Sequence, residues 1–182
     1  MLIGLVCPAG MGKDTAGNYL VEEWHFTRLA FGDYIYKEVS EKYSIPENIL
    51  RDRSTRECPN DGLNGLSPRQ ALQKHGQERR NEDPDYWVKK LSGLIDVKKD
   101  TVITDVRFNN EKDLIKSYGG YIIKIVPVGF VSTLSESTKN DISETQMIDM
   151  DADIYIKNIY GCTTSLICRL SYFVYQQLVK EE

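Results

Sequence analysis

The residues with the clearest capacity for chemistry stand near the N-terminus, in the stretch Gly10-Met-Gly-Lys-Asp-Thr15. An apolar run from Leu2 to Val6 precedes them and is typical of a buried parallel strand, and a helical pattern covers residues 12–23. A strand, a glycine loop, a lysine and a helix in this order predict a loop that binds phosphate groups. Glycines let backbone N–H groups curl around phosphate oxygens, and the N-terminus of the helix adds partial positive charge.

Lys13 and Asp14 are the charged residues of this loop. Lys13 can reach the β- and γ-phosphates of a nucleotide and follow charge during transfer. A carboxylate beside phosphates requires a cation between them, so we interpret Asp14 as a Mg²⁺ ligand, directly or through water. Two alternatives stay open: Asp14 could be a first-turn acid that complements the helix dipole, and the loop could be a plain glycine turn in which Lys13 is solvated.

The stretch from Thr101 to Glu111 is the second that contains residues able to take part in catalysis. Val102 and Ile103 predict a buried strand, and Asp105 follows at its end. Phosphoryl-transfer enzymes with this loop place a carboxylate there to hold Mg²⁺ or orient water. Arg107 comes two residues later, within reach of the same space.

A third set of polar residues follows the helix start at Ser67-Pro68. Arg69, Gln73 and Gly76 recur at spacings of three or four and therefore share one helical face. That face could grip a phosphate and a base edge, although a solvated polar face is the more common explanation.

Asp33 and Trp87 each allow two interpretations. Asp33 follows a predicted strand and could face substrate or metal, but we favour an N-cap for a helix that ends near Tyr43. Trp87 is more often a core residue than a platform on which a base stacks.

The order of patterns predicts an α/β fold with a parallel sheet covered by helices on both faces. We expect one domain over residues 1–182, with irregular, mobile segments at about 44–66 and 128–150. Further strands are expected at 26–31, 102–103, 121–126 and 153–156. Further helices are expected at 84–94, at a start capped by Asn109 or Asn110, and at 163–179.

Composition narrows the possible functions. The chain has 182 residues and a net charge of −4, which argues against binding a nucleic-acid polymer. No apolar run approaches the ~20 residues that span a bilayer, and the start does not have the pattern of a signal peptide. The cysteines lack metal-ligand or disulfide spacing, so we expect reduced thiols in the cytoplasm, which would be the host cytoplasm for a viral protein. The oligomeric state is open, with a homodimer among the alternatives.

Several stretches together resemble one family, the phage-type deoxynucleoside monophosphate kinases of the P-loop nucleoside monophosphate kinase class. The G-K-D-T form of the loop, Gly12 to Thr15, and the D-V-R-F-x-N-E signature, Asp105 to Glu111, are fairly specific in combination. Shorter similarities lie at residues 67–76, 85–88, 143–144 and 152–158. The chain departs from the family's pattern at Cys7, where a glycine is usual, and at Met11, Gln70 and Gln77.

The resemblance implies a P-loop three-layer sandwich that transfers phosphate from ATP, with Mg²⁺, to a deoxynucleoside monophosphate, giving ADP and a diphosphate. It implies that the ATP phosphates and Mg²⁺ lie at Gly10, Met11, Gly12, Lys13, Asp14 and Thr15. It implies an acceptor nucleotide near Arg69, Gln73, Gly76 and Trp87, and a catalytic site completed by Asp105, Arg107 and Glu111. Asp105 would position Mg²⁺ or an arginine, since the acceptor is already an oxyanion and needs no general base.

Three alternative functions use the same kind of loop. A kinase similar to dephospho-CoA kinase and one similar to phosphomevalonate kinase would act on other small molecules. A regulator that binds ATP without transferring phosphate would be a protein of a different class.

Overall fold

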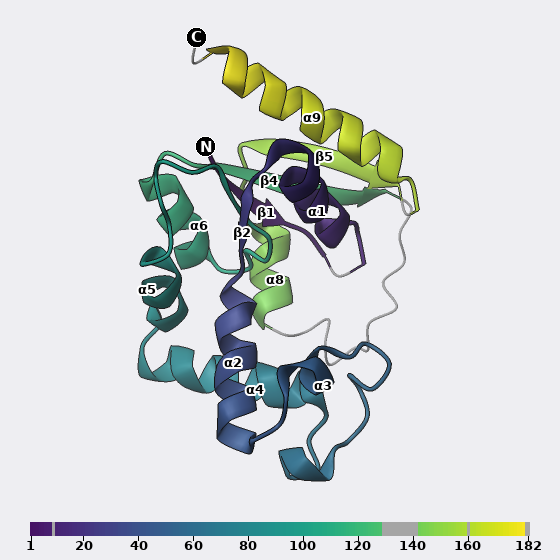
Figure 1. Ribbon diagram of the computed structural model, residues 1–182, viewed down its shortest axis with the longest axis vertical. Helices are drawn as coiled ribbons and strands as arrows, with labels where there is room; N and C mark the ends of the chain where they lie inside the picture. Colours follow the sequence, from purple (N-terminus) through teal and green to yellow (C-terminus); the bar gives the residue numbers. More distant parts are fainter. Residues whose placement is uncertain (9, 129–141, 160, 181–182) are drawn as a thin grey trace. The chain divides into compact units, whose positions relative to one another are not determined.

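The structure, a computed structural model, describes residues 1–8, 10–128, 142–159 and 161–180 (Figure 1). Its residue contacts separate into two compact units. Unit 1 contains residues 1–29 and 95–182, and unit 2 contains residues 30–94. The expectation of one domain stays a prediction.

Unit 1 is built on a parallel sheet with the strand order β2-β3-β1-β4-β5. The strands are β1 (Leu2–Val6), β2 (Thr27–Leu29), β3 (Thr101–Ile103), β4 (Tyr121–Val128) and β5 (Ile154–Ile159). β1 is central and buried throughout, which explains its continuous apolar run. The predicted parallel α/β sheet is confirmed.

Helices cover both faces of this sheet. α1 (Lys13–Trp24) and α9 (Thr163–Lys180) pack on one face, where Ile3 and Leu5 join a core with Leu20 of α1 and Leu166 of α9. Side chains alternate along a strand, so Gly4 faces the other side, where it lies against Ile115 of α6 (Asn109–Ser117).

On that second face Lys124 of β4 donates to the carbonyls of Ile148 and Met150 and so holds the end of α8 (Ile142–Asp149). The predicted three-layer sandwich is therefore confirmed, with α6 and α8 on the side of the sheet opposite α9 (Figure 1). Within the described ranges no helix combines the length and apolarity that crossing a membrane requires.

Unit 2 is helical and has its own core. Its elements are α2 (Phe31–Tyr43), α3 (Glu47–Arg51), the 3₁₀ turn η1 (Asp61–Leu63), α4 (Pro68–Glu82) and α5 (Tyr86–Ser92). The core consists of Val39, Leu50, Leu63, Ala71 and Leu72. The predicted start of α4 is confirmed, because Ser67 and Gln70 form a reciprocal capping box in front of Pro68.

Several sequence expectations about elements need correction. Residues 44–66 contain α3 and η1 and supply two core leucines, so the segment is less irregular than expected; its mobility stays a prediction. Part of the expected irregular segment 128–150 is helix α8, and residues 129–141 lie outside the described part of the chain. α2 begins at Phe31 after Ala30, so Asp33 is not its N-cap, and α6 begins at Asn109 after Phe108.

Candidate active site

The phosphate loop joins the C-terminal end of β1 to α1. Gly10 and Gly12 have φ angles of 81° and 94°, a left-handed conformation that glycine adopts without strain. An ideal Cβ on Gly12 would lie 2.8 Å from Leu166 Cδ2, so a side chain there would also displace Leu166 of α9. Gly12 caps α1 and has no side chain to occupy the N–H groups of its first turn, an arrangement suited to an anion.

Cys7 and Met11, the departures from the family's loop pattern, both point into the core. Their exposed fractions are 3% and 1%, and both pack in the apolar cluster beneath the loop. Burial raises the pKa of the Cys7 thiol to about 12, although the nearby Lys13 charge and backbone N–H lower it. Neither side chain occupies the outer face of the loop, so neither obstructs a phosphate there.

The charged pair of the loop lies at the start of α1. Lys13 Nζ is 3.4 Å from Asp14 Oδ1, and the side chains are 26% and 57% exposed. Thr15 is half-buried in the same turn. In the described residues no three His, Cys, Asp or Glu side chains form a metal-binding group. A single exposed carboxylate fits a Mg²⁺ ion that takes its other ligands from water and substrate phosphates.

The segment after β3 lies beside this loop. The N–H of Thr104 donates to the Leu29 carbonyl at 3.1 Å and that of Val106 to the Leu5 carbonyl at 3.2 Å, so the chain runs on between β2 and β1. Asp105 and Arg107 are therefore brought to the end of β1, where the charge of Arg107 offsets a small part of the rise that burial causes in the pKa of Cys7. Both side chains are partly exposed.

Glu111 is 2% exposed and serves the backbone of this segment. Its Oε2 accepts from the N–H groups of Arg107, at 2.8 Å, and Phe108, at 3.2 Å. A carboxylate in the first turn of a helix stabilises the helix start in this way, a function that we had expected from Asn109 or Asn110. Glu111 thus fixes the backbone that carries Arg107, and its expected catalytic role stays a prediction.

The residues expected to bind the acceptor are in unit 2. Arg69 is in the first turn of α4 with its side chain 15% exposed; its Nε contacts Glu57, and its N–H donates to the Arg56 carbonyl at 3.1 Å. Gln73 is one turn further along α4 and half-buried. Asp33 of α2 accepts from Arg51 Nη2 at 3.0 Å.

Gly76 and Trp87 form the contact between α4 and α5. The indole N–H of Trp87 donates to the Gly76 carbonyl at 3.2 Å, and the ring meets that of Tyr86 edge to face at 4.8 Å. An ideal Cβ on Gly76 would come within 3.3 Å of Ile35 and of Arg80, so the packing is tight. Because Trp87 is 1% exposed, its position here serves packing, and its contact with a base stays a prediction.

Glu38 is a residue that sequence reasoning missed. Its carboxylate accepts from His75 Nε2 at 2.8 Å and the Tyr86 hydroxyl at 2.7 Å, and it pairs with Arg79 and Lys90. Burial raises the pKa of Glu38, but hydrogen bonds from Lys90, His75 and Tyr86 outweigh it and lower the value to about 2. The available signal was the spacing of four residues that His75 and Arg79, and Tyr86 and Lys90, share.

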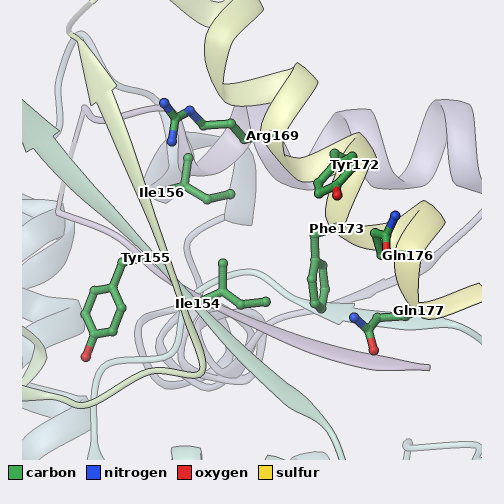
Figure 2. Close-up of a pocket in the computed structure, with 8 residues that line it drawn as sticks. All are labelled: Ile154, Tyr155, Ile156, Arg169, Tyr172, Phe173, Gln176 and Gln177. Atoms are coloured by element: carbon green, nitrogen blue, oxygen red, sulfur yellow. The ribbon is translucent and has the colours of Figure 1, made fainter. Parts of the chain in front are cut away.

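A cavity of about 380 Å³ lies between β5 and α9. Figure 2 shows Phe173 of α9 beside Ile154, with Tyr172, Gln176 and Gln177 on the same side of β5 and Tyr155 on the other. This cavity borders the N-terminal half of β5, whereas ligands of parallel sheets bind at the carboxyl ends of the strands. We therefore place the candidate active site at the phosphate loop.

A comparison with known proteins finds a relative that matches most of the chain. The chain is 30% identical, over 167 residues, to an Acanthamoeba polyphaga mimivirus protein named "Putative deoxynucleotide monophosphate kinase", with 82% of this chain and 86% of that protein covered. No family model matches.

Two solved kinases share the fold. Shikimate kinase from Aquifex aeolicus has a TM-score of 0.50 at 15% identity, with 98% of this chain and 99% of that chain covered. Dephospho-CoA kinase from Campylobacter jejuni has a TM-score of 0.53 at 14% identity, with 96% of each chain covered.

The relative matches most of the chain, and the phosphate loop follows the central strand of a parallel sheet in a fold shared with small-molecule kinases. The resemblance seen in the sequence is thereby confirmed: the chain belongs to the deoxynucleoside monophosphate kinase family of P-loop kinases.

Proposed function

We propose that the protein transfers the γ-phosphoryl group of ATP, with Mg²⁺, to a deoxynucleoside monophosphate. The observation that carries the proposal is the loop itself: two left-handed glycines, a helix start without a side-chain cap, and Lys13, with Arg107 brought alongside. This arrangement binds and stabilises charge on phosphate groups. The choice of acceptor is supported by the name of the mimivirus relative.

Each candidate site residue of unit 1 has a role in the proposed reaction. The loop N–H groups from Gly10 to Thr15 bind the β- and γ-phosphates, and Lys13 and Arg107 stabilise the charge that develops as the γ-phosphorus moves. A phosphate oxygen of the acceptor forms the new bond to that phosphorus as the bond to the ADP oxygen breaks. No strong base is needed, so Asp105 orients Arg107 or the metal.

Asp14 would hold the Mg²⁺ ion, directly or through water. The ion, when bound, neutralises charge on the β- and γ-phosphates. We expect Asp14→Asn to raise the Mg²⁺ concentration needed for half-maximal rate, because it removes one anionic ligand. A Mg²⁺ titration of the initial rate measures this. An unchanged titration would assign Asp14 to the helix dipole alone.

The acceptor monophosphate would bind the face of α4 that carries Arg69, Gln73 and Gly76, with Asp33 nearby on α2 in the same unit. Arg69 is the strongest candidate, because a guanidinium offers two parallel donors to a phosphate. In the structure its Nε contacts Glu57, a carboxylate that stands where an anionic substrate group would be expected. The acceptor phosphate would replace Glu57 on Arg69.

An ADP-release assay tests the proposal. The full chain is given ATP and Mg²⁺ with each deoxynucleoside monophosphate, each ribonucleoside monophosphate, dephospho-CoA and phosphomevalonate in turn. We expect the highest kcat/KM with one or more of the deoxynucleotides. In Lys13→Ala we expect that kcat/KM to be lower by at least roughly 100-fold. A preference for either of the last two compounds would replace the acceptor assignment, and ATP binding without turnover on any acceptor would indicate a regulator.

A further inference from the structure

Asn158 is a buried polar residue on the face of β5 that packs into the core. The strand alternates between covered and exposed positions, and Ile156 and Asn158 are 2% and 4% exposed. Burying an amide lowers stability unless its polar atoms form hydrogen bonds. An apolar side chain would suit the packing better, so the amide needs another explanation.

The amide nitrogen of Asn158 reaches the phosphate loop. Nδ2 donates to the backbone carbonyl of Met11 at 3.1 Å, although the two residues are 147 positions apart. Met11 lies between the left-handed residues Gly10 and Gly12, and its side chain is buried in the core. The carbonyl of Met11 is therefore held towards β5, on the inner side of the loop.

This hydrogen bond also sets the direction of the next N–H group. The described peptide bonds are trans, and in a trans peptide the carbonyl and the following N–H point in opposite directions. Because the Met11 carbonyl faces Asn158, the Gly12 N–H faces away from β5. An ideal Cβ on Gly12 would lie only 3.3 Å from Asn158 Nδ2, which shows how closely the amide packs against this peptide.

We infer that Asn158 is a positioning residue for nucleotide binding, which orients the Met11–Gly12 peptide so that the Gly12 N–H is presented to phosphate oxygens. The inference rests on the proposed function of the loop. Glycine-flanked peptides rotate readily, and the opposite orientation would turn the Met11 carbonyl oxygen towards the phosphates and repel them. By holding one orientation in advance, Asn158 reduces the cost of ordering the loop on binding.

The side-chain oxygen of Asn158 distinguishes a positioning role from a purely structural one. Oδ1 is buried and has no hydrogen-bond partner in the part of the chain that the structure describes. Exchanging the two amide atoms would place Oδ1 against the Met11 carbonyl, two acceptors facing each other. An unpaired buried acceptor lowers stability, so Asn158 is not the residue that best stabilises β5.

Measuring nucleotide affinity and thermal stability together tests the inference. Calorimetry gives the Kd of ADP with Mg²⁺, and of a deoxynucleoside monophosphate, for the full-length wild type, Asn158→Val and Asn158→Ala. Valine favours strands and is similar in size but has no donor, and alanine provides a second variant. Asn18→Ala, on the exposed side of α1, is the matched control.

We expect the Kd of ADP to rise roughly five- to tenfold in both Asn158 variants, the effect of about one hydrogen bond. The Kd of the monophosphate should not change, the Tm of Asn158→Val should equal or exceed that of the wild type, and Asn18→Ala should match the wild type. An unchanged ADP Kd in both variants would overturn the inference. So would a lower Tm with equal losses of affinity for both ligands, the signature of a structural role. A wild type that binds no ADP would instead refute the proposed function.

Discussion

Lys13 is the residue on which we expect phosphoryl transfer to depend most directly. Its side chain is 26% exposed and contacts Asp14 rather than the core, so it contributes little to packing. We expect Lys13→Ala to lower kcat/KM by at least roughly 100-fold, as the loss of a preorganised charge does, and to leave the Tm close to that of the wild type. Steady-state kinetics and thermal unfolding measure the two effects.

Lys74→Ala, at an exposed position of α4, provides the control for removing a surface charge. It should retain wild-type kinetics. If Lys13→Ala were as active as Lys74→Ala, the loop would be a structural turn.

Arg69 should act on the acceptor and not on ATP. Lysine keeps the charge of Arg69 but cannot offer paired donors to a phosphate, so we expect Arg69→Lys to raise the KM of the monophosphate roughly tenfold while the KM of ATP stays the same. Varying each substrate in turn measures both constants. A rise in the KM of ATP alone would assign α4 to the other substrate.

A substitution of Glu57 should change the KM of the monophosphate in the opposite direction. Glu57→Gln weakens the carboxylate contact that Arg69 makes in the structure, so the acceptor phosphate would compete with a weaker partner. We expect the KM of the monophosphate to fall in this variant. An equal or higher KM would show that Glu57 does not occupy the phosphate position.

At the scale of elements, the predictable features are those with local signals. β1 and α1 could be predicted because a continuous apolar run and two glycines lie within a few residues of each other. The start of α4 could be predicted from Ser67 and Pro68, which stabilise a helix start by themselves.

The features that were missed depend on contacts between separate segments or on unusual caps. α2 starts after Ala30, which has no polar side chain, and α6 is stabilised by Glu111 reaching back from its first turn. Glu38 meets His75 and Lys90 across 37 and 52 residues of sequence, and the four-residue spacings on α4 and α5 do not identify Glu38 as their shared partner. Likewise, only the fold shows that Cys7 and Met11 point inwards and that Asn158 contacts the loop.

The contacts of Glu38 predict that the stability of unit 2 depends on pH. The pKa of Glu38 falls from an ordinary value of 4.5 to about 2, so its ionised form is favoured by folding. This contribution is fully present above pH ~4.5 and is lost as the pH falls towards 2. We expect Glu38→Gln to lower the free energy of unfolding at pH 7 by roughly 1–3 kcal/mol, because Lys90, His75 and Arg79 lose a charged partner.

Denaturant unfolding at several pH values measures this dependence. The difference in the free energy of unfolding between the wild type and Glu38→Gln should shrink as the pH falls from about 4.5 towards 2. Glu41→Gln, an exposed position of the same helix, should show no such difference. If the free energies of unfolding of the wild type and Glu38→Gln differed by the same amount at all pH values, the Glu38 charge would not stabilise unit 2.

At the scale of the whole molecule, the two substrates are expected to contact different units. The phosphate loop, Asp105 and Arg107 belong to unit 1, and Arg69, Gln73 and Asp33 belong to unit 2. A ligand that binds the folded state slows the opening of the backbone that it contacts. The position of protection along the chain therefore reports which unit each substrate uses.

Amide hydrogen exchange of the full chain, with ADP and Mg²⁺ or with a deoxynucleoside monophosphate, tests this division. We expect ADP to protect peptides that cover residues 10–17, because we propose that the loop N–H groups bind its β-phosphate. We expect the monophosphate to protect peptides that cover residues 67–77 of α4. Lys13→Ala should weaken only the protection by ADP, and Arg69→Lys should weaken only the protection by the monophosphate. Protection of the phosphate loop by the monophosphate with no change in α4 would place the acceptor in unit 1 and refute the assignment of α4.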